Sequence, residues 1–298
     1  MPAEPFDEFS FLAAQAAELG VAHVPPAERI ALTLPQGGTV SALRFGEAAP
    51  VVTFLHGAGL NAHTWDATVL ALGLPALAVD LPGHGDSSWR ADARYTAATL
   101  APDAAAAIAA ATTVPQVLVG QSLGGLVAAT IAADRPALVR TLVVVDITPD
   151  VDPDGDAAML RAFFSGPADW ASRDELVERA LAFGLGGSRE AATRGVFLNS
   201  RVRPDGRVEW KHHLARLAAS GDPVASALDG TGWDALARVA APIALIRGER
   251  GFVTEADAEL FRARLPAASV HTVPTGHNVQ EERPAELAEL IARIAGNV

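Results

Sequence analysis

The strongest chemical signal in the chain is the run Gly120-Gln121-Ser122-Leu123-Gly124, a Gly-x-Ser-x-Gly pattern. It stands between a short apolar run and an alanine-rich stretch typical of a helix. A strand-to-helix turn this tight leaves no space for side chains at the two glycines, and it holds the serine in a strained conformation that exposes its hydroxyl. The N-terminus of the following helix favours developing negative charge. We therefore predict that Ser122 is a nucleophile.

A serine hydroxyl is a weak nucleophile until a base removes its proton, and we predict that His277 is this base. His277 follows the last apolar run of the chain and precedes the final helical stretch. A loop at the end of a strand is where an imidazole can reach the turn of a neighbouring strand. The other histidines lie in the N-terminal segment, in glycine-rich loops, in a strand or in the middle of the chain, and none is expected to be the base: His23, His56, His63, His84, His212, His213 and His271.

A second glycine-rich loop, His56-Gly57-Ala58-Gly59, follows another apolar run. Its glycines allow the backbone N–H of Ala58 to approach the carbonyl oxygen of a substrate. Together with the N–H of Leu123, it would form an oxyanion hole, which is usually a large contribution to acyl transfer. We expect His56 to organise this loop.

These residues need a scaffold, and short apolar runs supply one. Their hydrophobicity is continuous rather than alternating, which indicates strands buried on both faces of a parallel sheet. Helical stretches alternate with them, so the expected fold is α/β with right-handed crossovers. A hairpin of residues 29–34 and 39–45 comes first. The other expected strands are 51–55, 75–79, 117–119, 142–145, 243–246 and 270–273, and the expected helices are 95–111, 123–133, 254–264 and one beginning at 282.

The alternation stops between residues 150 and 239, where helical segments occur without a convincing strand. An insertion at this place suggests a helical cap over the carboxyl edge of the sheet, where open α/β sheets bind ligands. We expect its aromatic side chains Phe163, Phe164 and Trp170 to line an apolar substrate pocket. The predicted division is an N-terminal extension, a core in two segments, and the cap, with bounds 1–28, 29–149 with 240–298, and 150–239.

In their order along the chain, these motifs resemble those of the α/β-hydrolase superfamily, and the resemblance covers residues 29–298. It implies a mostly parallel central sheet with flanking helices, and a triad of serine, acid and histidine. It is specific for the fold and not for the substrate, because this fold supports many chemistries.

The acid is where the chain departs from this pattern. Most relatives place an aspartate where this chain has Gly251, in the run Gly248-Glu249-Arg250-Gly251. Some esterases, lactonases and haloalkane dehalogenases of the superfamily instead carry an acid at the end of the strand after the serine's helix. Asp146 occupies that place and keeps the chain order Ser, Asp, His. We favour Asp146 over Glu249 as the acid.

The resemblance implies hydrolysis of a carboxylic ester or a lactone through an acyl-enzyme on Ser122. A carbon–carbon bond hydrolase, an acyltransferase or a cofactor-free haloperoxidase would use the same motifs. A ligand receptor on a hydrolase scaffold, with little or no turnover, is the alternative from another class. The absence of an aspartate at position 251 is its support.

Composition favours a small-molecule enzyme of the cell interior. The formal net charge of -12 argues against a nucleic acid or an anionic membrane surface as partner. Cysteine is absent, which excludes disulfides, thiolate nucleophiles and zinc–thiolate sites. We find no sequence pattern for a metal or nucleotide, so we expect no cofactor. The acidic N-terminus lacks the basic start of a secretory signal, and no run is long enough to span a membrane, so we expect a cytoplasmic protein.

Overall fold

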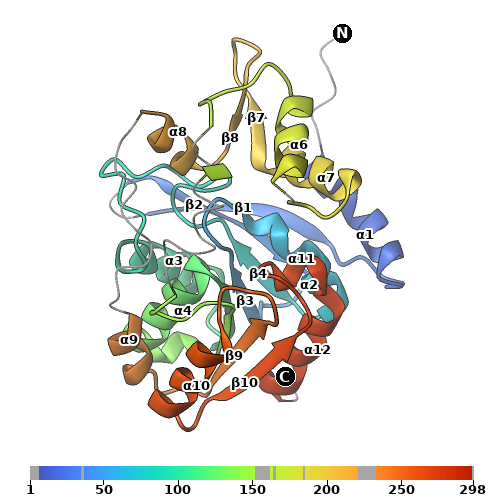
Figure 1. Cartoon of the computed structure of the whole chain (residues 1–298). Coiled ribbons are helices and arrows are strands. Elements are labelled where there is room, and N and C mark those ends of the chain that lie inside the picture. Colours follow the sequence, from blue (N-terminus) through green and yellow to red (C-terminus); the bar gives the residue numbers. More distant parts are fainter. Residues whose placement is uncertain are drawn as a thin grey trace.

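The computed structural model describes residues 7–34, 37–151, 162–163, 166–183, 185–220 and 232–296. Its centre is an eight-stranded sheet with the order β1-β2-β4-β3-β5-β6-β9-β10 (Figure 1). The β1–β2 and β2–β4 pairs are antiparallel, and every other neighbouring pair in this sheet is parallel. The strands are β1 (Ala27–Thr33), β2 (Thr39–Phe45), β3 (Val52–Leu55), β4 (Ala76–Val79), β5 (Gln116–Gln121), β6 (Val139–Val145), β9 (Ile243–Gly248) and β10 (Ser269–Val273). The predicted fold class is confirmed.

Both faces of the sheet are covered, as the continuous apolar runs indicated. On β5, Leu118 points into one apolar core, and its neighbours Val117 and Val119 point into the other. Helices α3 (Ala97–Ala111), α4 (Leu123–Asp134) and α10 (Glu255–Arg264) contribute to the first core. Helices α2 (Asp66–Leu72) and α12 (Pro284–Ala295) contribute to the second, on the opposite side of the sheet (Figure 1). Single turns of helix, η2 (Ala62–Trp65), η3 (Pro136–Leu138) and α11 (Val279–Glu282), join these elements.

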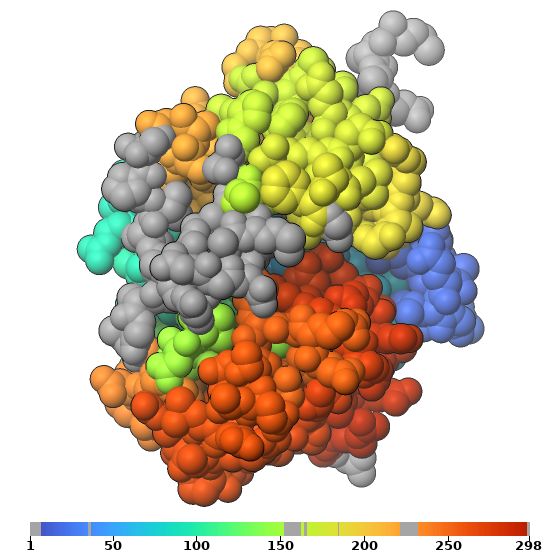
Figure 2. Space-filling model, in the orientation of Figure 1, coloured from blue at the N-terminus to red at the C-terminus, as the bar shows by residue number. Residues whose placement is uncertain are grey.

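The N-terminal segment packs against the core. It forms η1 (Glu8–Phe11) and α1 (Leu12–Glu18), and the buried side chains of Leu12 and Ala16 belong to the same apolar core as α2. The predicted extension of residues 1–28 therefore ends slightly too late, because Ala27 and Glu28 already pair in β1. Figure 2 shows this segment (blue) beside both the cap (yellow) and the C-terminal part of the core (red).

The inserted segment forms its own small apolar core above the sheet (Figure 1). It contains α6 (Arg173–Ala182), α7 (Arg189–Asn199) and α8 (His213–Ser220). It also contains an antiparallel pair, β7 (Ser200–Val202) and β8 (Val208–Trp210), so the expectation of a cap without strands was wrong. Helix α9 (Gly232–Arg238), expected in the cap, packs against α4 of the core.

Candidate active site

Ser122 lies in the turn between β5 and α4 with φ +53° and ψ −124°, a conformation that strains a residue with a side chain. Two glycines make this turn possible. A Cβ at Gly120 would overlap the carbonyl of Gly124, and a Cβ at Gly124 would overlap the carbonyl of Leu55. The N–H of Ser122 donates to the carbonyl of Val145 at 3.0 Å, which fixes the turn to β6. The serine side chain is thereby directed to a pocket under the cap.

His277 follows β10, and its Nδ1 lies 2.7 Å from Oδ2 of Asp146. Its ring stacks on Phe252, with ring centroids 3.6 Å apart and planes 12° apart. The histidine side chain is 12% exposed and lines the same pocket as Ser122. Its other nitrogen, Nε2, lies 3.0 Å from the amide nitrogen of Gln121. Three contacts therefore fix the ring: Phe252 on one face, Asp146 at Nδ1 and Gln121 at Nε2.

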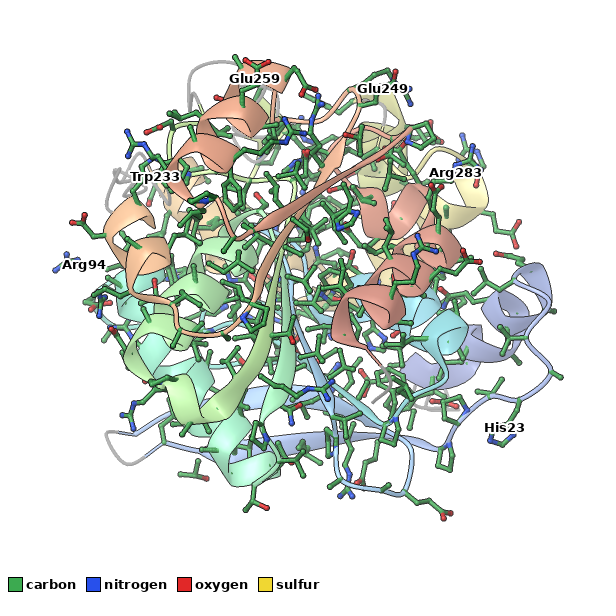
Figure 3. All side chains as sticks on the ribbon, turned by 90° about the horizontal axis from the view of Figure 1, so that it is seen from below. His23, Arg94, Trp233, Glu249, Glu259 and Arg283 are labelled. Atoms are coloured by element: carbon green, nitrogen blue, oxygen red, sulfur yellow. The ribbon has the colours of Figure 1, made fainter. Side chains whose placement is uncertain are left out.

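Asp146 directly follows β6 with a positive φ of 48°, and its side chain is fully buried. Besides His277, it accepts hydrogen bonds from the N–H of Gly248 at 2.9 Å and of Phe252 at 2.7 Å. A buried carboxylate with three donors is compensated for the loss of water. Glu249, by contrast, is exposed, and Figure 3 shows it at the periphery of the molecule. The structure thus brings Asp146 to His277 and leaves Glu249 outside the pocket.

The two amides expected to stabilise an oxyanion come from the residue after Ser122 and from a loop of the same pocket. Leu123 is the first residue of α4, so its N–H has no carbonyl partner within that helix. Ala58 lies on the loop after β3 and lines the pocket. That loop is fixed by His56, whose Nδ1 lies 2.7 Å from the carbonyl of Gly57 and whose Nε2 accepts from the N–H of Leu81 at 3.0 Å. Burial lowers the pKa of His56, consistent with an organising role.

The pocket above Ser122 has a volume of about 210 Å³. Its apolar wall comes largely from the cap and comprises Phe163, Ala180, Leu185, Ala192, Val196, Leu198 and Trp210. Its polar side includes, besides Ser122, His277 and Gln121, the side chains of Gln15, Asn61, His63, Thr64, Arg194, Asn199, Asn278, Gln280 and Glu281. The sequence interpretation missed Trp210, Leu198 and Gln121; only the place of Gln121, next to the nucleophile, was a usable signal.

The three aromatic residues expected in the pocket have different places. Phe163 lines the pocket and also packs against Phe183 and Trp210 in the cap core. Trp170 does not line it, because its ring packs in the cap core, where its backbone pairs with Val208. Phe164 lies outside the described residues.

His212 and His213 do not line the pocket. His212 is buried and stacks on Trp210 with centroids 5.7 Å apart. His213 Nδ1 lies 2.7 Å from the hydroxyl of Tyr95 and joins the cap to the core. Within the described ranges, no group of three or more His, Asp or Glu side chains could hold a metal ion. None of the described helices meets the length and apolarity that crossing a bilayer requires.

An open, mostly parallel sheet that presents a strained serine beside a histidine–carboxylate pair is the architecture of an α/β hydrolase. The chain belongs to the α/β-hydrolase family, whose model matches residues 54–290. It is 38% identical over 295 residues to the esterase Rv0045c of Mycobacterium tuberculosis, covering 96% of this chain and 94% of that protein. The solved structure of that esterase has a TM-score of 0.83 and 36% identity, covering 97% of this chain and 98% of the other.

Two more distant relatives have other names. A pimeloyl-[acyl-carrier protein] methyl ester esterase of Xanthomonas campestris pv. campestris is 34% identical over 76% of this chain and 87% of its own length. The sn-1-specific diacylglycerol lipase ABHD11 of Mus musculus is 29% identical over 81% of this chain and 80% of its own length. The predictions of the family and of a hydrolase are confirmed.

Proposed function

We propose that this protein is a serine esterase that acts on a small molecule through an acyl-enzyme on Ser122. Ester cleavage, predicted from the sequence, is confirmed as the reaction class by the esterase with which the chain shares 38% identity over 96% of its length. The observation that carries the assignment of residues is the 2.7 Å contact between His277 Nδ1 and the buried Asp146, in the pocket that Ser122 lines. A carboxylate at Nδ1 fixes the proton there, so that Nε2 carries the lone pair that accepts the serine proton.

In the first half of the reaction, Ser122 Oγ attacks the ester carbonyl carbon, and its proton passes to His277 Nε2. Asp146 stabilises the imidazolium that forms. The carbonyl oxygen becomes negatively charged, and the amides of Ala58 and Leu123 donate to it. When the tetrahedral intermediate collapses, the C–O bond to the alcohol breaks, and the alcohol leaves with the proton from His277.

In the second half, a water molecule gives a proton to His277 Nε2 and attacks the acyl carbon. The Ser122–acyl bond breaks, the proton returns to Ser122 Oγ, and the carboxylic acid leaves. The enzyme is thereby restored without any redox step or cofactor.

The cap suggests that an apolar group of the substrate is recognised. Its side chains form the apolar wall of a pocket of about 210 Å³, which suits a short aliphatic or aromatic group. A lactone enters the same scheme with its alcohol tethered to the acyl group, and we propose lactones as a second substrate class. The cytoplasmic location stays a prediction.

The test combines two variants with an active-site serine probe. Ser122→Ala should reduce kcat on p-nitrophenyl esters by about 10³-fold or more and abolish labelling. His277→Ala should cause a similar loss, and the double variant should be little worse than either, because the two residues act as a unit. More than a tenth of wild-type activity in Ser122→Ala would exclude Ser122 as nucleophile. A panel of lactones measured beside the esters decides the second class, and a correctly folded wild type that neither turns over nor labels would favour the receptor alternative.

A further inference from the structure

Gln121, the residue before the nucleophile, contacts the base. Its amide nitrogen Nε2 lies 3.0 Å from His277 Nε2, 3.3 Å from the carbonyl oxygen of His277 and 3.4 Å from Oδ1 of Asn278. The last two are acceptors, so the nitrogen of the amide, and not its oxygen, must face this cluster. The amide therefore donates to a neutral imidazole whose proton is on Nδ1, toward Asp146.

The other end of the Gln121 amide has no such partner. Oε1 is buried, and no donor among the described residues reaches it. It lies against Gly57, where a Cβ would overlap it. The side chain is 1% exposed, so its orientation leaves a buried acceptor unsatisfied. An unpaired buried acceptor costs stability, so the contacts of the amide nitrogen must account for this orientation.

The contact also occupies the lone pair that catalysis needs. His277 Nε2 must accept the proton of Ser122, yet it accepts a hydrogen bond from Gln121 instead. Among the described residues, no hydrogen bond joins the Ser122 hydroxyl to His277. In this arrangement, His277 can accept the proton of Ser122 only after its contact with Gln121 breaks.

We propose that Gln121 is a positioning residue that occupies the Nε2 lone pair of His277 until a substrate binds. This inference rests on the proposed function, because it requires His277 to be the general base. Once Nε2 carries the proton from Ser122, it faces the N–H of Gln121 donor to donor, and the contact is lost. The imidazolium is thereby directed away from Gln121, toward the leaving alcohol in the pocket.

Gln121 differs in effect from the charged groups around His277. Asp146 binds Nδ1, Glu282 accepts from the N–H of Gly276 at 2.9 Å, and Glu281 accepts from the side chain of Asn278 at 3.3 Å. Of these three carboxylates, only Asp146 contacts the imidazole, and the other two contact the neighbouring residues of its loop. Phe252, which stacks on the ring, is uncharged. Gln121 donates to the neutral form and so favours the free base.

The pH profile of kcat/KM separates this role from a structural one. Gln121→Met keeps the length of the side chain and removes the donor, so the acid limb should move up by about 0.5–1 pH unit. Because the resting contact is gone, the plateau above that limb should rise by about 2- to 10-fold. Gln121→Glu puts a carboxylate at the same place and should move the acid limb up further.

Gln280→Met is the matched control. Gln280 is also a buried glutamine of the pocket wall with an unsatisfied Oε1, but its amide donates to Thr64 and does not reach His277. The acid limb of the Gln280→Met variant should stay at the wild-type pH. Thermal melts and titration with a serine probe correct each profile for unfolded enzyme. An unmoved acid limb in Gln121→Met, or a plateau below wild type per titrated site, overturns the inference. Loss of the proposed function would be recognised separately, by activity that survives Ser122→Ala.

Discussion

The carboxylate of Asp146 occupies the space into which a side chain at position 251 would project. A Cβ built on Gly251 would overlap both carboxylate oxygens of Asp146. The glycine that interrupts the family pattern is thus the consequence of an acid approaching from β6, because the two places cannot both be filled. The N–H groups of Gly248 and Phe252, on either side of Gly251, donate to the relocated carboxylate.

Asp146→Asn should lower kcat by about 10²–10⁴-fold, because the side-chain amide can donate a hydrogen bond to Nδ1 of His277 and so favour the imidazole tautomer with its proton on Nε2. Glu249→Gln is the control. Glu249 is exposed and follows Gly248, so this variant should retain near wild-type kcat. Both are measured on the best ester of the panel, with a thermal melt to confirm folding. The reverse pattern, a silent Asp146→Asn and an inactive Glu249→Gln, would transfer the role to Glu249.

Returning the acid to its usual place offers a stricter test. Asp146→Gly should be nearly inactive, although the positive φ of 48° at this position suits glycine. Adding Gly251→Asp to that variant should recover at least about tenfold in kcat, because the vacated space now admits a carboxylate on the same side of His277. Gly251→Asp alone should instead lower both activity and melting temperature, since it places two carboxylates in one space. No recovery in the double variant would show that the approach from β6 is required.

The fold and most of the site geometry were predictable because their physical causes are local. Continuous apolar runs indicate strands buried on both faces, and Gly120 and Gly124 indicate a turn without room for side chains. The position of Asp146 at the end of a strand was visible too. What the sequence lacks is the direction of a side chain. Nothing in the run around Gln121 indicates that its amide turns toward His277.

The cap was less predictable, because its segments are short and lack a clear period. The β7–β8 pair has three residues in each strand, and Arg201 and Glu209 interrupt its apolar pattern. The direction of an aromatic ring depends on packing between segments that are distant in sequence. For this reason Phe163 and Trp170 looked alike, although only Phe163 lines the pocket.

That difference gives a prediction about specificity. Phe163→Ala should enlarge the pocket and shift the preferred acyl or alcohol chain length upward, in addition to lowering the melting temperature. Trp170→Ala is the matched control from the same cap core: it should lower the melting temperature and leave the chain-length preference unchanged. The readout is kcat/KM across p-nitrophenyl esters of increasing length. If Phe163→Ala lowers kcat/KM by the same factor on all esters, Phe163 contributes only to the core of the cap.

The N-terminal segment should confer a pH-dependent stability through Glu8. Its carboxylate lies 3.0 Å from His63 Nε2 and 2.6 Å from Arg29, which in turn contacts the buried Asp80. Burial opposes the charge of Glu8, but the hydrogen bonds of His63 and Arg29 outweigh it and lower its pKa to about 2. Burial also opposes the charge of His63, but Asp66 and Glu8 raise its pKa to about 9.

These two shifts have opposite signs. The contribution of Glu8 is complete above its unfolded pKa of 4.5 and is lost as the pH falls through about 2. The contribution of His63 is complete below its unfolded pKa of 6.5 and is lost as the pH rises through about 9. Both are complete between these unfolded values. Glu8→Gln should therefore lower the melting temperature most near pH 5.5, by about 2–5 °C, and less at pH 2 or pH 10.

Thermal melts of wild type and Glu8→Gln at these three pH values check the prediction, with Glu18→Gln as the control. Glu18 lies in the same N-terminal segment but is exposed, so its substitution should change the melting temperature by less than about 1 °C at every pH. Because His63 also lines the pocket, loosening this cluster should raise KM more than it lowers kcat. A melting-temperature difference for Glu8→Gln that is the same at all three pH values would mean that the ion pairs with His63 and Arg29 do not contribute to stability, and that Glu8 acts only through its packing.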